Sequence, residues 1–264
     1  MKKIGLVLSG GGVRGIAHIG ILQALEEEGI QPTLLSGSSA GAMVAALYAA
    51  DYPPKEMLDF FRQNNSILRW RHFSYSKPGL LDAEGYASMF DHWLKDRSFD
   101  SLSKELHICA TDVLSGLPYY FSKGDLVKAI LASSAVPGIF TPVEISSNWY
   151  VDGGTMNNFP TEPIADQCDL MIGSFVSPEG TISKKELTNS FKMLNRAIGL
   201  SVMANSLLKF HVCDFVFMPK ELAHYGLFDT SKMDEIYEIG YQYAQDQLDN
   251  LWKAIGGEIQ RQLG

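Results

Sequence analysis

The chain has 264 residues, of which 46% are apolar and 20% are charged, and its net charge is −8. This length fits one large domain, and the ordinary globular composition excludes a disordered or low-complexity protein. Nucleic-acid binding normally requires a basic excess or stripe, which this chain lacks, so we expect no nucleic-acid partner.

A membrane-spanning protein is excluded on similar grounds, and we expect no signal peptide. The longest uncharged apolar stretch, residues 40–50, is far shorter than the ~20 residues that a transmembrane helix needs. At the N-terminus, a short apolar run leads directly into three glycines and is too short for a signal peptide. The three cysteines, Cys109, Cys168 and Cys213, form no CxxC pair. We therefore expect a cytoplasmic protein with reduced cysteines and no metal site.

Apolar runs of strand length alternate with segments of helical periodicity along the chain. The expected strands cover residues 3–9, 33–36, 105–113, 119–122, 149–151, 170–176 and 213–218. The expected helices cover residues 16–28, 40–50, 126–134, 185–210 and 231–255. This order predicts an α/β fold with three layers, α/β/α, around a mostly parallel central sheet. No linker or internal repeat divides the chain, so we expect one domain over residues 1–264.

The first motif is a glycine loop between the first strand and the first helix. Gly10, Gly12 and Gly15 satisfy G-x-G-x-x-G, which is typical of dinucleotide sites. Such a site also needs an acidic residue about 20 positions later to bind ribose, and residues 35–39 carry no acid. The alternatives are a tight turn without a ligand and a loop whose backbone N–H groups hold a developing oxyanion.

The second motif, Gly37-Ser38-Ser39-Ala40-Gly41, matches G-x-S-x-G. It lies between a short apolar strand and an alanine-rich helix, which is the context of a nucleophile elbow. An elbow would expose Ser39 at a helix N-terminus, where the helix dipole favours negative charge on Oγ. The N–H of Ala40 could then join an oxyanion hole.

Residues 60–81 contain no acidic residue, although the protein as a whole is acidic. Cations and aromatic residues are interleaved in this segment, as in Arg69, Trp70 and Arg71. This pattern is typical of a peripheral membrane contact, here at the inner face of the membrane. The alternative is an aromatic cluster that packs on the domain while its arginines remain in water.

A nucleophilic Ser39 needs a base, and Asp152 is the strongest candidate. It closes a short strand and is followed by Gly153 and Gly154, and strand ends in parallel sheets face the ligand crevice. A carboxylate can serve as the base when it contacts Oγ directly in a dry pocket. The alternative is a triad of Ser39, Asp152 and a late histidine, His211 or His224, in the order usual for α/β-hydrolases.

Three motifs follow one another along the chain: the glycine loop at residues 10–15, the serine motif at residues 37–41 and Asp152-Gly153-Gly154. In this order they resemble the patatin-like phospholipase family. Three further blocks resemble it as well: Ala110-Thr111-Asp112 with Gly116, residues 132–137 (ASSAVP) with Phe140, and Asn157-Asn158 with Pro160. The resemblance covers roughly residues 4–165, and the length of the chain indicates a small stand-alone member of bacterial type.

The resemblance implies a patatin-like fold and hydrolysis of acyl esters of lipids. It implies a Ser39–Asp152 dyad, with Ser39 as nucleophile and Asp152 as base, and an oxyanion loop formed by Gly11, Gly12, Val13 and Arg14. Such a mechanism needs no metal and no organic cofactor. Two other functions stay open: a catalytically silent member that acts by binding, and a nucleotide-binding protein that uses the Gly10–Gly15 loop.

Overall fold

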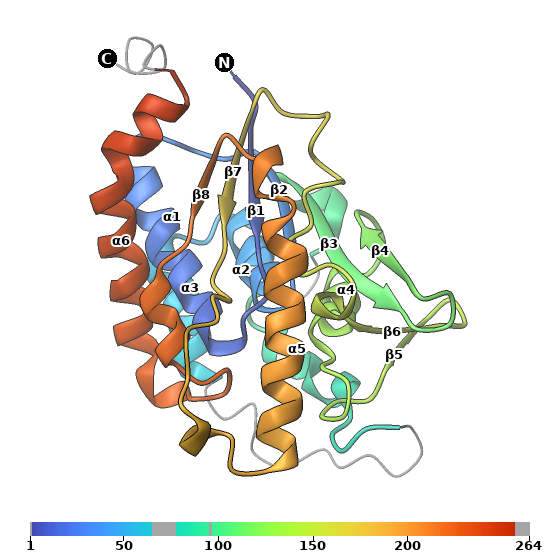
Figure 1. The fold of residues 1–264 in the computed structure, drawn as a ribbon. Coiled ribbons are helices and arrows are strands. Elements are labelled where there is room, and N and C mark those ends of the chain that lie inside the picture. The colour runs from blue at the N-terminus through green and yellow to red at the C-terminus, as the bar shows by residue number, and fades with distance from the viewer. Residues whose placement is uncertain (1, 65–77, 95–96, 257–264) are drawn as a thin grey trace.

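An eight-stranded sheet forms the centre of this computed structural model, which describes residues 2–64, 78–94 and 97–256 (Figure 1). The strand order is β5-β6-β3-β2-β1-β7-β8, and β4 pairs with β3 outside this path. The strands are β1 (Ile4–Leu8), β2 (Leu34–Ser38), β3 (Glu105–Asp112), β4 (Leu117–Phe121), β5 (Val143–Ile145), β6 (Asn148–Asp152), β7 (Leu170–Ser174) and β8 (Phe215–Phe217). The helices are α1 (Ala17–Glu27), α2 (Ala40–Ala49), α3 (Pro54–Gln63), α4 (Leu126–Ser134), α5 (Ser190–Leu207) and α6 (Met233–Ala254).

The middle of the sheet is parallel, as the sequence predicts. Strand β1 pairs in parallel with β2 and β7, β2 with β3, and β7 with β8, whereas β4, β5 and β6 form antiparallel pairs. The register aligns Leu8 with Gly37 on one side and with Ser174 on the other. The loops that follow β1, β2 and β7 therefore leave the sheet at the same edge, where parallel sheets hold their ligands.

The side chains of β1 divide the core into two layers. Leu6 and Leu8 belong to the large cluster on the face covered by α1, α2, α4 and α6. Val7 points to the other face and belongs to a smaller cluster that includes Phe159 and Phe175. Figure 1 shows α5 on this second face, apart from the other helices. The three-layer α/β/α prediction is confirmed, with unequal helical layers.

Helix α5 is shorter than predicted and presents apolar side chains to solvent. The expected helix over residues 185–210 is divided into a 3-10 turn at Lys184–Glu186, α5 itself and a second turn at Phe210–Val212. Asn189 sets the start of α5, because its side chain accepts a hydrogen bond from the N–H of Lys192. Several apolar side chains of α5 are exposed: Met193, Leu194, Ile198, Leu200 and Leu207.

Helix α3 and strand β5 were not predicted from the sequence. Pro54 occupies the first turn of α3, where its missing N–H costs nothing. Strand β5 forms a hairpin with β6 whose turn contains Ser146 and Ser147, both with positive φ, instead of the usual Asn-Gly. No helix within the described ranges is long and apolar enough to cross a membrane. The single domain over residues 1–264 stays a prediction.

Candidate active site

Ser39 occupies a strained turn between β2 and α2. Its φ is 52° and its ψ is −124°, which is unusual for a residue other than glycine. Its N–H donates to Ser133 Oγ at 2.8 Å, and that hydroxyl donates in turn to the carbonyl of Cys109 at 2.5 Å. A Cβ at Gly41 would lie 2.4 Å from the carbonyl oxygen of Leu8, so the turn requires glycine at this position.

Asp152 meets this serine from the end of β6. Ser39 Oγ donates to Asp152 Oδ2 at 2.6 Å, and the N–H of Gly154 donates to Asp152 Oδ1 at 2.7 Å. The Asp152 residue is 7% exposed. Burial raises its pKa from 3.8 to about 6, and the hydrogen bonds from Ser39 and Gly154 oppose that rise. The result is an aspartate that is a stronger base than usual and remains mostly ionised at neutral pH.

The glycine loop lies beside Ser39. A Cβ at Gly10 would lie 3.0 Å from Ser39 Cβ, and one at Gly12, whose φ is +57°, would lie 2.3 Å from the carbonyl oxygen of Leu227. After Gly11 the chain forms a 3-10 turn, Gly12–Ile16, which leads into α1. Close approach therefore requires glycines here, because any side chain would collide with the elbow or with the segment that contains Leu227.

The predicted oxyanion loop divides into two parts. The N–H of Val13 donates to Leu227 O at 2.8 Å and that of Arg14 to Gly11 O at 3.2 Å, so neither is free for a substrate oxygen. The N–H groups of Gly11, Gly12 and Ala40 donate to no other described residue.

The Arg14 side chain ties the loop to the C-terminal part of the chain. It is buried, and it donates to the carbonyls of Tyr225 at 2.7 Å and Pro178 at 3.3 Å. Burial lowers the pKa of its guanidinium, while Glu179 nearby opposes that change. Its contacts are therefore those of a residue that supports the loop.

An apolar cavity of about 140 Å³ opens beside Ser39. None of the described residues that line it is charged, so a hydrocarbon group could enter without removing water from a charged side chain among them. Leu227 and Phe228, which are 40% and 39% exposed, lie where the cavity meets solvent. The largest lining side chains are Met43, Phe61, Tyr86, Met89, Phe90, Phe140, Phe228 and Met233.

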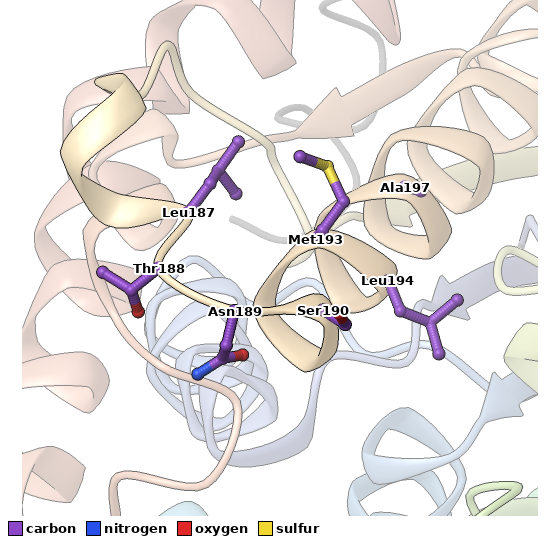
Figure 2. Close-up of a pocket in the computed structure, with 7 residues that line it drawn as sticks. All are labelled: Leu187, Thr188, Asn189, Ser190, Met193, Leu194 and Ala197. Atoms are coloured by element: carbon purple, nitrogen blue, oxygen red, sulfur yellow. The ribbon is translucent and has the colours of Figure 1, made fainter.

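A second hollow lies at the start of α5 (Figure 2). Leu187, Met193 and Leu194 are among its lining residues, and they carry no acid or base. Ser39 and Asp152 are not among its lining residues. This hollow therefore lacks the groups that the reaction of a serine hydrolase would require.

The two late histidines do not contact Ser39. His211 and His224 are exposed and lie in 3-10 turns of the C-terminal half, without a hydrogen bond to Ser39 or Asp152. His18 is fully buried, with Nδ1 2.6 Å from Ser174 Oγ and Nε2 2.8 Å from the carbonyl of Ser9. Burial lowers the pKa of His18 to about 4, so this ring is neutral at physiological pH.

Sequence reasoning assigned no role to three polar residues that support the site. Ser133 binds the backbone of Ser39, while Asn158 and Ser177 bind the backbone of Gly10. Ser133 and Asn158 lie in the blocks that resemble the family, which was the available signal, whereas no motif marks Ser177. Arg69, Trp70 and Arg71 lie outside the described residues, as does most of the acid-free segment.

The fold and the site together define an α/β protein in which a serine on a strained elbow contacts a buried aspartate beside a glycine loop. The family profile described as patatin-like phospholipase matches residues 6–165, which is more than half of the chain. The chain therefore belongs to the patatin-like phospholipase family.

Relatives with similar sequences are longer than this chain. An uncharacterized NTE family protein of Mycobacterium tuberculosis (strain H37Rv) is 34% identical over 205 residues, which cover 74% of this chain and 56% of that protein. Lysophospholipase NTE1 of Kluyveromyces lactis is 28% identical over 281 residues, which cover 95% of this chain and 19% of that protein. The chain thus spans about half or less of these relatives.

Solved structures share the fold at low sequence identity. VipD from Legionella pneumophila matches with a TM-score of 0.54 and 17% identity, over 95% of this chain and 67% of that chain. Human GIVD cytosolic phospholipase A2 matches with a TM-score of 0.53 and 10% identity, over 96% of this chain and 60% of that chain. At these identities the likeness concerns the fold alone.

Proposed function

We propose that this protein is a serine hydrolase of lipid acyl esters, in which Ser39 is the nucleophile and Asp152 the general base. The proposal rests mainly on the hydrogen bond of 2.6 Å from Ser39 Oγ to the buried carboxylate of Asp152. Direct contact of this kind supports the proposal, because a general base must lie within hydrogen-bond reach of the proton that it removes. The raised pKa of Asp152 strengthens it for that task.

The first half of the reaction acylates Ser39. Asp152 accepts the hydroxyl proton while Oγ attacks the ester carbonyl carbon, and the carbonyl oxygen takes the negative charge. The N–H groups of Gly11, Gly12 and Ala40, which no described residue occupies, are the donors available to that oxyanion, and Val13 and Arg14 shape the loop. The tetrahedral intermediate then collapses, the proton passes from Asp152 to the leaving alkoxide, and the alcohol departs.

The second half releases the acyl group. Asp152 takes a proton from a water molecule, which attacks the acyl-serine carbonyl in the same oxyanion site. Collapse of this intermediate returns the proton to Ser39 Oγ and frees a fatty acid. Every proton in this cycle is carried by Asp152, Ser39, water or the leaving alcohol, so the chemistry needs no metal and no organic cofactor.

The apolar cavity and the relatives support a lipid substrate. A cavity whose described lining is uncharged accepts an acyl chain through apolar burial, which is worth about 0.8 kcal/mol per methylene group. Five fungal relatives carry the name lysophospholipase, which suggests a phospholipid with one acyl chain as the first substrate to test.

Two other functions have less support. A nucleotide-binding protein would need room for a pyrophosphate at the glycine loop. In this structure Gly10 packs against Ser39, and the N–H of Val13 is hydrogen-bonded to the carbonyl of Leu227. A catalytically silent member would not need a hydrogen bond between Ser39 and Asp152. It would also not need backbone N–H groups beside this pair that donate to no described residue.

The membrane contact through Arg69, Trp70 and Arg71 remains a sequence-based proposal. We also keep the proposal that the protein is cytoplasmic and reaches the inner face of the membrane through this segment.

A fluorophosphonate probe tests the assignment of Ser39. It should label the wild-type protein on the peptide that contains Ser39, and the same protein should hydrolyse p-nitrophenyl esters. Ser39→Ala should lose both properties and keep its fold by circular dichroism, because only the nucleophile is removed. Ser201→Ala, which removes an exposed hydroxyl on α5, is the matched control and should keep both. Retained turnover in purified Ser39→Ala protein would refute the assignment.

A further inference from the structure

The carbonyl of Gly10 is held by three hydrogen-bond donors. Ser177 Oγ donates to it at 2.6 Å, Ser9 Oγ at 3.0 Å and Asn158 Nδ2 at 3.4 Å. The three donors come from different parts of the chain: the end of β1, the loop after β6 and the loop after β7. One backbone carbonyl rarely needs more than two partners, so this peptide is unusually constrained.

That constraint fixes the direction of the next N–H. A trans peptide is planar, and its N–H points away from its C=O. Holding the carbonyl of Gly10 therefore aims the N–H of Gly11 to the opposite side. This N–H donates to no other described residue, and it belongs to the loop that packs against Ser39.

The neighbouring atoms leave this peptide little freedom. A Cβ at Gly11 would lie 2.8 Å from Val176 Cγ2 and 3.1 Å from Ser177 Oγ, so the loop is pressed against the segment after β7. The N–H of Gly10 donates to the carbonyl of Asn158 at 3.2 Å. Asn158 thus holds Gly10 on both sides, through its backbone and its side chain.

Asn158 also contacts the segment that carries the base. A Cβ at Gly154 would lie 2.9 Å from Asn158 Oδ1 and 3.0 Å from Asp152 Oδ1. The Asn158 amide therefore sits between the glycine loop and the Asp-Gly-Gly turn. It couples the position of the oxyanion donor to that of the carboxylate.

We propose that Ser177 and Asn158 are positioning residues that hold the Gly10 carbonyl, so that the Gly11 N–H faces the oxyanion formed at Ser39. This inference rests on the proposed hydrolase function and deepens it. Neither residue touches the reacting atoms; both act through one peptide plane. An N–H aimed before the substrate arrives costs no reorganisation when the negative charge develops.

Ser177 gives the cleaner test, because it is half-buried and its hydroxyl donates to the Gly10 carbonyl, whereas Asn158 also lies against the Asp-Gly-Gly turn. Loss of a complete oxyanion donor costs roughly 10²- to 10³-fold in kcat, so a misaimed donor in Ser177→Ala should lower kcat at least about 10-fold. The KM for a soluble p-nitrophenyl ester should change less than about 2-fold, because the donor acts on the transition state more than on the bound ester. Labelling by the fluorophosphonate should slow in parallel, since its phosphoryl oxygen occupies the same site.

Threonine and valine have nearly the same shape, so these two substitutions at position 177 distinguish the effect of the hydrogen bond on kcat from the effect of packing. Ser177→Thr keeps the hydroxyl and should retain kcat close to that of the wild type, whereas Ser177→Val has the same shape without the donor and should match Ser177→Ala. This comparison still decides the question if Ser177→Ala fails to fold. The matched control is Ser206→Ala, which removes a buried hydroxyl that donates to the carbonyl of Val202 on α5, far along the chain from the elbow.

The outcomes distinguish this inference from the function on which it rests. A wild-type protein without Ser39-dependent turnover or labelling refutes the hydrolase itself. If the wild type is active, unchanged kcat in Ser177→Ala, equal loss in Ser177→Thr and Ser177→Val, or equal loss in Ser206→Ala refutes only the positioning role. A kcat loss confined to Ser177→Ala and Ser177→Val, at constant KM, supports it.

Discussion

Replacing Asp152 by Asn should stop the reaction and, at neutral pH, stabilise the fold. Asp152 is 7% exposed, and its carboxylate receives hydrogen bonds only from Ser39 and Gly154 among the described residues. Loss of its charge removes the proposed general base, which should lower kcat at least about 10²-fold. The same loss removes a buried negative charge whose contacts with the described residues include no cation.

The size of the stabilisation follows from the pKa. Burial raises the pKa of Asp152 from 3.8 to about 6, so the folded protein holds the proton more tightly than the unfolded chain does. The free energy of unfolding therefore falls as pH rises between these values, by about 1.36 kcal/mol per pH unit and by about 3 kcal/mol in all. An asparagine side chain cannot ionise, so above pH 6 the Asp152→Asn variant should keep the free energy of unfolding that the wild type loses.

Urea denaturation of both proteins between pH 4 and pH 8 measures the effect. The difference in the free energy of unfolding, Asp152→Asn minus wild type, should rise across the window between the two pKa values and level off above it. Ser39→Ala is the control, because it is also inactive but keeps the carboxylate and hence the pH-dependent loss. A difference that stays flat with pH, or falls, would refute the raised pKa and the reasoning from burial.

The remaining predictions concern the base, its titration and the membrane. His211→Ala and His224→Ala should each keep kcat within about 3-fold, and a loss of about 10²-fold in His224→Ala alone would support a triad instead. The rate kcat/KM should fall as pH drops below about 6, because the base must be ionised, and a rate that is flat down to pH 4 would contradict this. Replacing Arg69 and Arg71 by Glu should weaken binding to anionic vesicles by a few kcal/mol, at about 1 kcal/mol for each charge removed and again for each charge added, and should leave the soluble-ester rate unchanged. Equal losses on vesicles and on the soluble ester would show that this segment supports the fold.

Local patterns predicted most of the sheet and the two halves of the site. Strand β1 is a continuous apolar run between a charged start and a glycine loop, so its place inside a parallel sheet could be read directly. The G-x-S-x-G pattern contains the glycines that the elbow needs, and Asp152 ends a strand. Each of these features is contained within a few residues, which is why the sequence reveals it.

The parts that sequence reasoning missed depend on contacts between distant residues. Ser133 meets Ser39 across 94 positions, and Ser177 meets Gly10 across 167. A single serine carries no local pattern that would show which carbonyl or N–H it binds. The order of β3, β2, β1 and β7 in the sheet brings these residues together, so their role appears only with the fold.

Two features of the site are costly for the fold, and the proposed catalysis would explain both. The backbone of Ser39 has a φ of 52°, and a non-glycine residue in such a conformation costs on the order of 1–3 kcal/mol. Burial of the Asp152 charge costs about 3 kcal/mol at neutral pH, as worked out above. A protein that only bound a ligand at the glycine loop would be more stable with glycine at position 39 and asparagine at position 152. The presence of Ser39 and Asp152 at these positions, in direct contact, is what a nucleophile and its base require.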